Sequence, residues 1–527
     1  MLTVSTFLAY TLFVAFYAWF RLKKEKLSSE EGYFLGGRSL TGIVIAGSML
    51  LTNISTEHLI GMNGSSYKNG FIIIGWEVTS ALALVLAAVY FIPKYLSMGL
   101  TTIPEYLEKR FDGVLRSYIA FFLMISFVVT LLPIVLYTGA INLESIFGIS
   151  ERLSISKEQG LLVTVIGVGL IGSLYAILGG LKAVAVSDTL NGYGLLIGGL
   201  AVPLLALINI GEGNPIKGLL KVFEYAPEKF NVIGAPDSVL PLEVLFTGLI
   251  VNQIYFWCMN QTIIQRALGA QNLKEAQKGL LFTGLLKIFI PLVIILPGVI
   301  GFYYFGDSLY ATQDMVYPEL IKKVLPASFV GLFAAVVMGA VLSTFNSVLN
   351  SAATIFSLDL YKRHFNRSAS DQKLVFIGKL TSSILAIFAI IVAPFVAQAP
   401  EGLYQLLQQL NGIFFIPIAS IMLMGFFTKS ISAFAAKVTL FFGLAFYLLT
   451  SFVFDTGLHF VHLWGIEFLL NLVLMYGFSY YYPNTNHFEI SDLKLVKMEQ
   501  WSYTKTFSIA LCLITLIIYI AMGTFGS

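Results

Sequence analysis

A run of polar and ionisable residues interrupts an apolar segment near the N-terminus. The stretch TGIVIAGSM at 41–49 has the composition of half a membrane-spanning helix, and soon after it come Asn53, Ser55, Thr56, Glu57 and His58. Carboxylate and imidazole groups are costly inside a bilayer and usually mark a binding site or an ion pathway. A break in the helix near Leu51–Ser55 would free carbonyl oxygens, which suit a hard cation such as Na⁺. The alternative is a kinked helix whose polar groups are hydrogen-bonded to neighbouring helices.

Two residues of opposite charge occur in otherwise apolar segments far apart in the chain. Glu77 lies in FIIIGWEVTSALA and Lys287 in GLLFTGLLKIFIPL. Each charge alone would be expensive in a membrane, whereas a pair across a helix bundle neutralises both. The sequence therefore predicts a Glu77–Lys287 pair. The pair serves either as a structural ion pair or as a hydrogen-bonding group for a polyhydroxylated solute.

A third polar cluster interrupts the segment GAVLSTFNSVLNSAATIF at 339–356. Its members are Ser343, Thr344, Asn346, Ser347, Asn350 and Ser351. Ser343 and Ser347 are one turn apart and share a helix face. Such hydroxyls either bond the carbonyl of the preceding turn or act as neutral oxygen ligands for a monovalent cation. Neutral ligands favour Na⁺ over divalent ions, which prefer carboxylates.

Three more polar residues stand in apolar segments. Asp188, in AVAVSDTLNGYG, supplies a carboxylate for a second sodium site with Asn346 and Ser347, or pairs with a Lys or Arg near one membrane surface. Gln408, in LYQLLQQLNG, has the setting of an ordinary cap or surface residue. We interpret Glu467 as structural.

The composition identifies the class of protein that must position these residues. Of 527 residues, 57% are hydrophobic and only 12% are charged, against about 25% in soluble domains. Apolar runs of about 20 residues, the length that crosses a bilayer, recur along the chain. We predict an all-α polytopic membrane protein that forms one transmembrane domain over 1–527. The expected spans, about fourteen in number, are 2–20, 41–66, 70–97, 117–147, 159–178, 181–209, 242–266, 276–305, 327–359, 373–398, 402–427, 430–453, 457–480 and 503–522.

The polar interruptions indicate an internal repeat. The second span is interrupted at 52–58 and the seventh, five spans later, at 252–261. Broken helices at matching positions in two halves are typical of transporters built from inverted repeats, with the binding site at the membrane midplane. We therefore assign two core repeats and four peripheral helices. The repeats are about 41–209 and 242–427, and the peripheral helices about 2–20, 430–453, 457–480 and 503–522.

The charge distribution predicts an orientation and excludes some partners. With the basic run RLKKEK at 21–26 in the cytoplasm, about three times as many Lys and Arg lie on the cytoplasmic side as outside. Both termini are then extracytoplasmic, and the first apolar run, which precedes its basic cluster, is not expected to be a cleavable signal. The net charge of +3 does not point to nucleic acid. Cys258 and Cys512 form no disulfide framework or metal-binding pattern.

Five segments together resemble the sodium/solute symporter family, and within it the sodium–sugar cotransporters. They are NISTEHLIGMNGSSY at 53–67, TTIPEYLEKRF at 101–111, GGLKAVAVSD at 179–188, YFWCMNQTIIQRALGAQNLKEAQKG at 255–279 and STFNSVLNSAATIFSLDLYK at 343–362. The resemblance runs over nearly the whole chain. It implies an inverted five-helix repeat with one helix before it and several after it.

The resemblance also implies roles for individual residues. A sodium ion would be held by the backbone carbonyls of Leu51, Ile54 and Ala340 and the hydroxyls of Ser343 and Thr344. The family's sugar-contacting positions correspond to His58, Glu77, Ser80, Gln253, Lys287 and Gln408. Its hydrophobic gates correspond to Met62, Trp76, Phe256 and Tyr404. Members that carry two sodium ions have polar residues at the positions of Asn346 and Ser347, and Asp188 would complete that second site.

Three positions depart from the common pattern of the family. Its sugar transporters commonly have Tyr where Phe256 stands, and Phe lacks the hydroxyl. Some bacterial members have Gln where His58 stands and Asn where Gln253 stands. His58 is similar to the residue of the animal glucose transporters. These differences bear on the particular sugar and not on the class of solute.

Together these features predict a sodium-coupled symporter, and not an enzyme, that imports a neutral sugar or polyol by alternating access across the cell membrane. An anionic solute would require an Arg fork in the cavity, and the second to fourth spans contain no Arg within the membrane. The alternatives are symport of another small solute, such as a sialic acid or an amino or carboxylic acid, or a cation channel. A channel would need rings of charge or carbonyls along a pore. A proton-pumping respiratory subunit would need a row of buried ionisable groups, and a sensor or scaffold would need no midplane ion pair.

Overall fold

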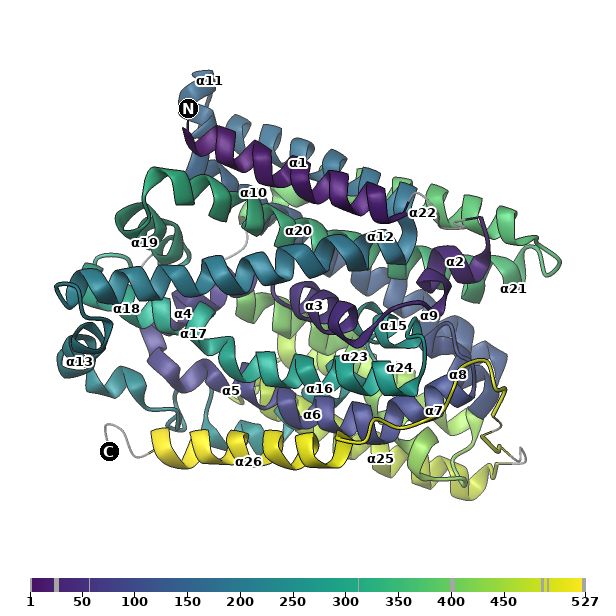
Figure 1. The fold of residues 1–527 in the computed structure, drawn as a ribbon. Helices are drawn as coiled ribbons and strands as arrows, with labels where there is room; N and C mark the ends of the chain where they lie inside the picture. Colours follow the sequence, from purple (N-terminus) through teal and green to yellow (C-terminus); the bar gives the residue numbers. More distant parts are fainter. Residues whose placement is uncertain are drawn as a thin grey trace.

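Helices are the regular secondary structure of the part of the chain that the computed structural model describes, and that part contains no β-strand. That part comprises residues 2–22, 28–55, 57–310, 312–398, 403–484, 488–490 and 492–523, so Thr56 and most of the run RLKKEK at 21–26 lie outside it. The start of α1 (Leu2–Leu22) and the end of α26 (Thr504–Met522) lie at the same end of the helix bundle (Figure 1). An even number of membrane crossings requires this arrangement.

The count of continuous apolar helices is lower than the sequence predicts. The described residues contain 11 helices long and apolar enough to cross a membrane, or 12 if the bent pair Leu273–Phe289 and Pro291–Phe305 is one span. The sequence predicts about fourteen, and the difference arises where spans are broken into shorter helices. The helical stretch Glu57–Ser97 covers the end of the second predicted span and all of the third, but the chain turns between those two spans at Gly70, which has φ 69° and ψ −149°. The seventh is split into pieces of 11 and 8 residues, too short to cross alone.

The first predicted repeat begins with a broken helix and continues through short helical pieces. The broken helix consists of α3 (Gly42–Asn53), η2 (Glu57–Met62) and α4 (Asn63–Asn69). The following span consists of η3 (Gly70–Ile74), α5 (Gly75–Val78), α6 (Ser80–Leu86), η4 (Ala87–Phe91) and α7 (Ile92–Ser97). A short helix, α8 (Ile103–Arg110), leads to α9 (Gly113–Ser126), η5 (Phe127–Leu131) and α10 (Leu132–Phe147).

The fifth and sixth predicted spans form the two arms of α12 (Lys157–Ile210), the longest helix in Figure 1. The arms meet at Gly180, whose φ of +57° favours glycine. A Cβ atom there would also lie 2.5 Å from the carbonyl oxygen of Tyr33. The predicted boundary between 178 and 181 is therefore confirmed, because the backbone turns at a position whose conformation and close contact favour glycine.

The second predicted repeat contains another broken helix, and the last helices flank it. Its elements are η7 (Leu242–Phe246), α14 (Gly248–Cys258), α15 (Gln261–Leu268), α16 (Leu273–Phe289), α17 (Pro291–Ile294), α18 (Leu296–Phe305), α19 (Val316–Val324), α20 (Ala327–Ile355), η9 (Phe356–Tyr361), α22 (Asp371–Val392) and α23 (Leu403–Phe427). The flanking helices are α24 (Ala433–Phe452) and α25 (Phe460–Tyr481), followed by α26. Short connecting helices are α2 (Glu30–Phe34), η1 (Gly36–Arg38), α11 (Ile149–Leu153), α13 (Pro215–Tyr225), η6 (Pro227–Phe230), η8 (Gln313–Met315), α21 (Lys362–His364) and η10 (Ala393–Gln398).

The two broken helices lie inside the bundle. α3 packs against α12, α16 and α20, and every residue from Ile45 to Asn53 is buried. α14 packs against α6, α23 and α25. An irregular backbone is tolerated at membrane depth only where protein or a cavity surrounds it. The packing of α3 and α14 meets this condition and places both breaks near the centre of the molecule.

Candidate functional site

The first break lies where the polar run begins. α3 ends at Asn53, and Ile54 adopts an extended conformation with φ −86° and ψ 96°. The carbonyls in the last turn of a helix lack the amide donors of a following turn. The predicted break near Leu51–Ser55 is therefore confirmed, and with it a source of free carbonyl oxygens.

The second break lies in the seventh predicted span. α14 ends at Cys258, and Asn260 caps the next helix, its side-chain oxygen accepting the amide of Thr262 at 2.9 Å. The interruption predicted at 252–261 thus corresponds to a real discontinuity. The chain carries two discontinuous helices five predicted spans apart.

Glu77 and Lys287 form the predicted buried pair. The Lys287 ammonium donates to Oε2 of Glu77 and, at 2.6 Å, to Oδ1 of Asn53. Both charged side chains are 1% exposed. Asn53 ends α3, so the ammonium joins the first break to α5 and α16. Because the ammonium has three donors, these contacts occupy two of them.

His58 lies between two carboxylates. Its Nδ1 is 3.7 Å from Oε1 of Glu57, and its Nε2 is 3.7 Å from Oε1 of Glu77. The second oxygen of Glu57 is buried and has no hydrogen-bond partner in the described structure. Sequence reasoning assigned no role to Asn53 or Glu57, although both belong to the polar run at 53–58 that signalled the site.

A central cavity brings most of the predicted solute-contacting residues together. Its lining includes His58, Trp76, Glu77, Ser80, Gln253, Phe256, Tyr404 and Gln408, and also Thr344 from the predicted sodium site. Lys287 and Met62 are buried but do not line it. Lys287 therefore supports Glu77 from behind the cavity wall. Asn53, Glu57, Asn260 and Asn411 are additional polar lining residues.

Gln253 is held by four hydrogen bonds. Its amide nitrogen donates to the Trp76 carbonyl at 2.8 Å and to Oγ1 of Thr79 at 3.0 Å. Its oxygen accepts from Oγ of Ser80 and from Nε1 of Trp257, both at 3.1 Å. A side-chain amide has two donors and two lone pairs, so Gln253 can bond a solute only by exchanging one of these partners.

Aromatic rings cover one side of the cavity. The Tyr404 ring lies 5.4 Å from His58 and 5.8 Å from Trp76, centroid to centroid. Trp76 in turn contacts Trp464 of α25 at 6.1 Å. Gly61 allows Tyr404 to pack closely against the broken helix, because a Cβ atom at position 61 would lie 2.8 Å from Cβ of Tyr404. The predicted gate residues Trp76 and Tyr404 thus contact each other in the lining of the cavity.

The elements of the predicted sodium site also meet. Oγ1 of Thr344 donates to the carbonyl of Thr52 at 3.1 Å, which places α20 against the free end of α3. Leu51, Ile54 and Ala340 are fully buried, and Ser343 and Thr344 nearly so. These carbonyl and hydroxyl oxygens are hard, neutral donors, and such a set fits Na⁺.

Asp188, predicted as part of a second sodium site, is close to a cation. Its Oδ2 lies 3.8 Å from Nη2 of Arg266 and accepts Oγ of Ser48 at 2.7 Å. Arg266 also donates to the Ser347 hydroxyl, which donates to the Ser343 carbonyl at 2.6 Å. Oδ1 of Asn346 has no hydrogen-bond partner in the described structure and faces a separate small cavity. The sequence left two roles open for Asp188, a second sodium site or a pair with a Lys or Arg. The contact with Arg266 fits the second of these roles.

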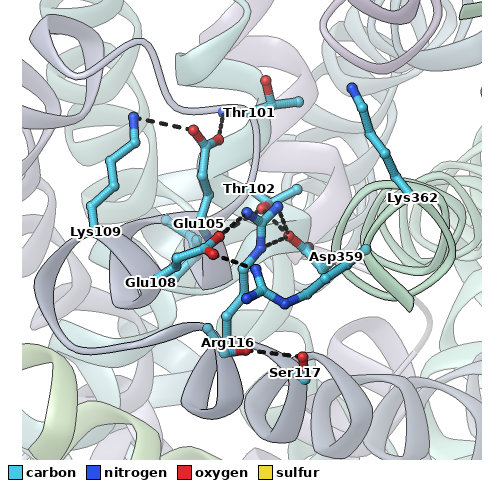
Figure 2. Close-up of polar contacts among 12 residues, drawn as sticks. Thr101, Thr102, Glu105, Glu108, Lys109, Arg116, Ser117, Asp359 and Lys362 are labelled. Atoms are coloured by element: carbon cyan, nitrogen blue, oxygen red, sulfur yellow. Dashed lines mark hydrogen bonds and ion pairs between the residues drawn. The ribbon is translucent and has the colours of Figure 1, made fainter. Parts of the chain in front are cut away.

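A charged cluster joins three segments at the end of the bundle opposite the termini (Figure 2). Arg116 of α9 donates to Asp359 of η9 at 2.6 Å and to Glu108 of α8 at 2.5 Å, and Arg363 also binds Glu108. Burial alone would raise the pKa of Glu108, but the hydrogen bonds from Arg363 and Arg116 lower it below its ordinary value. Oγ1 of Thr102 adds a bond to Asp359 at 2.9 Å. The cluster therefore fixes α8 to the ends of α9 and η9.

The fold and the site together define a secondary transporter: two discontinuous helices meet at a buried polar cavity, with carbonyl oxygens free at the break. A sequence model of the "Sodium:solute symporter family" matches residues 33–443. The chain belongs to this family, and the resemblance seen in its motifs is confirmed. It is an integral membrane protein that couples transport of a small solute to sodium.

Three relatives are informative: one is an uncharacterized symporter, and two are named as a sodium/glucose and a sodium/myo-inositol cotransporter. The chain is 43% identical over 525 residues to an uncharacterized symporter of Escherichia coli K12, YidK, covering 100% of this chain and 92% of the relative. It is 34% identical over 430 residues to a sodium/glucose cotransporter of Vibrio parahaemolyticus, covering 78% and 77%. It is 30% identical over 459 residues to the human sodium/myo-inositol cotransporter, covering 80% of this chain and 62% of the relative.

A solved structure shares the fold. A Na⁺-coupled sialic acid symporter in a substrate-bound, outward-open state superimposes with a TM-score of 0.78, covering 91% of this chain and 98% of that one. The sequence identity is 19%, so this likeness concerns the fold alone.

Proposed function

We propose that the chain imports a neutral sugar or polyol together with Na⁺ across the cell membrane by alternating access. The observation that carries this proposal is the chemistry of the central cavity. Carboxylates, an imidazole and side-chain amides face it, and no Lys or Arg is among the described residues of its lining. The nearby ammonium of Lys287 is already bound to Glu77 and Asn53.

The lining suits hydroxyl groups, each of which both donates and accepts hydrogen bonds. Glu77 and Glu57 supply hydrogen-bond acceptors, and His58 and Gln408 can both donate and accept. Aromatic rings for the apolar faces of a sugar come from Trp76, Phe256 and Tyr404. An anion would meet the carboxylates of Glu57 and Glu77, and the nearby ammonium of Lys287 is already paired. That field opposes anions, which supports a neutral solute over a sialic or carboxylic acid.

We assign the coupling ion to the junction of α3 and α20. The carbonyls of Leu51, Ile54 and Ala340 and the hydroxyls of Ser343 and Thr344 would hold it. The ion supplies the driving force, to which the membrane potential adds about 2.3 kcal/mol per charge per 100 mV. Because the broken segment leads directly to His58, a sodium ion at this junction and a solute beside His58 would contact the same stretch of backbone.

The wider arrangement follows from the same proposal. The repeats 41–209 and 242–427 each contribute one broken helix to the site, and both termini lie outside the cytoplasm. A cation channel is disfavoured, because aromatic rings close one side of the cavity.

Uptake into proteoliposomes tests the proposal. A panel of labelled hexoses, inositols, a sialic acid and small carboxylic acids would be offered with either Na⁺ or choline outside. We expect saturable uptake of one or more neutral solutes that requires Na⁺. Sodium-dependent uptake of the acids, with no uptake of the neutral solutes, would contradict it.

A further inference from the structure

An apolar groove lies on the outer face of the bundle, apart from the polar cavity. α26 packs against α6 and α16, and a cavity of about 620 Å³ remains between it, α6, η7 and α14. Pockets that hold small ligands have volumes of about 300–1,000 Å³. Leu82, Leu249, Ile250 and Leu516 are among the side chains that line the groove.

The length of the groove matches one leaflet of a bilayer. Along α26 its lining runs from Cys512 to Gly523, just past the end of the helix. At a rise of 1.5 Å per residue this spans about 16 Å. Half of a hydrocarbon core of about 30 Å is about 15 Å. A chain that entered at the end of α26 would therefore reach the middle of the membrane and stop there.

Two hydroxyls in the groove are without a hydrogen-bond partner in the described structure. They are Oγ1 of Thr515 and Oη of Tyr519, one turn apart on the same face of α26. Thr515 is 4% exposed. An unpaired buried hydroxyl is unfavourable, so both groups favour an occupant that brings an acceptor. Tyr519 lies about one turn from the end of α26, near the mouth of the groove.

We propose that this groove binds one acyl chain of a membrane phospholipid, and that the Tyr519 hydroxyl donates to the ester carbonyl of that lipid. The apolar walls take the hydrocarbon, the length of the groove limits the chain to one leaflet, and Tyr519 fixes its polar end. The site differs from ordinary lipid contact along α1 or the outer face of α26, because it is concave and holds buried unpaired donors.

The groove shares a wall with the polar cavity. Gln253 lines both, and its bond to Thr79, another groove residue, is one of the four that hold it. A lipid chain in the groove would support this wall from the membrane side. The binding proposal itself does not depend on the transported solute.

Native mass spectrometry of the purified full-length protein, with phosphatidylcholine as the probe, tests the site. We expect the wild type to retain one phosphatidylcholine after detergent exchange, and Ile250→Trp, which fills the groove, to lose it. Leu513→Trp is the matched control: Leu513 is 52% exposed, against 53% for Ile250, but lies outside the groove. Tyr519→Phe should weaken retention about fivefold, the effect of losing one hydrogen bond.

The two cysteines provide an independent measurement. Cys512 is exposed and lines the groove, whereas Cys258 is buried. Added phosphatidylcholine should therefore slow the reaction of Cys512 with a maleimide in the wild type and in Leu513→Trp, but not in Ile250→Trp. Absence of a retained lipid, equal retention in both Trp variants, or no protection of Cys512 would each overturn the proposal. Unchanged lipid retention in Tyr519→Phe would show that Tyr519 does not bind the ester group of the lipid.

Discussion

Glu77 has two oxygens with different surroundings. Oε2 accepts the Lys287 ammonium, while Oε1 lies 3.7 Å from Nε2 of His58, and the residue lines the cavity. A carboxylate held in this way presents a fixed, charged acceptor whose desolvation is already balanced by its partner. The ion pair can therefore be structural and bind solute at once, and the two alternatives left open by the sequence need not compete.

Glu77→Gln tests this double role. Because hydrogen bonds to a charged group contribute about 1.5–3 kcal/mol, we expect solute affinity to fall tens-fold while sodium affinity is nearly unchanged. Calorimetric titration of purified protein would measure both. The variant also leaves Lys287 without a counter-charge, so Glu77→Gln with Lys287→Met serves as the control: stability should recover but solute affinity should not. Loss of sodium affinity with solute affinity intact would contradict the assignment.

Ser343 and Thr344 offer the most direct test of the sodium site. Removing one neutral ligand by Ser343→Ala should raise the sodium concentration for half-maximal uptake by about tenfold, if the ligand contributes about 1.4 kcal/mol. Thr354→Ala, which removes a hydroxyl from the same helix, is the control. An unchanged sodium dependence in Ser343→Ala would remove this residue from the site.

The Asp188 contacts bear on the number of ions carried. Since Arg266 lies 3.8 Å from Asp188 and binds Ser347, a second ion would have to displace a cation that is already present. We expect about one sodium per solute, measured as the ratio of sodium-22 to solute flux. A ratio near two that drops to one in Asn346→Ala would instead establish the second site.

At the scale of helices, the cluster around Arg116 joins α8, α9 and η9 (Figure 2). The Asp359 side chain is fully buried, so Arg116→Ala would leave its charge without a counter-charge, with only the hydrogen bond from Thr102 remaining. We expect a loss of about 3–5 kcal/mol in the free energy of unfolding, measured by denaturant titration in detergent. Adding Asp359→Asn should recover most of the loss. Lys217→Ala, which breaks an exposed pair with Glu212, should change stability by less than about 1 kcal/mol, and an equal effect of both would contradict the account.

The broken helices were predictable because their signal is local. Polar residues inside apolar runs mark 52–58 and 252–261, and Gly180 falls between two predicted spans. The Arg116 cluster was not predicted. It depends on contacts between residues far apart in sequence, for which apolar periodicity carries no signal. Gln253 was placed at the site by resemblance, but its four bonds to Trp76, Thr79, Ser80 and Trp257 appear only once the helices are packed.

At the scale of the whole molecule, the site lies where the two broken helices, α20 and α23 converge, and aromatic rings cover it on one side. A transporter of this kind exposes its site to each side of the membrane in turn. The contacts of Trp76 with Tyr404 and Trp464 link the covering rings to α23 and α25. Under the proposed alternating access, the helices that carry these rings would move for solute to pass.

The central claim is that a neutral solute crosses together with Na⁺, and its most direct test is the effect of membrane potential on sodium-driven uptake. One Na⁺ with a neutral solute carries one net charge per cycle, and each charge gains about 2.3 kcal/mol per 100 mV. A potassium gradient with valinomycin sets the potential in proteoliposomes, and the labelled solute found by the uptake panel reports the rate. We predict that an inside-negative potential accelerates uptake strongly, and only when Na⁺ is outside. Uptake that is insensitive to the potential, or that proceeds equally in choline, would contradict the account.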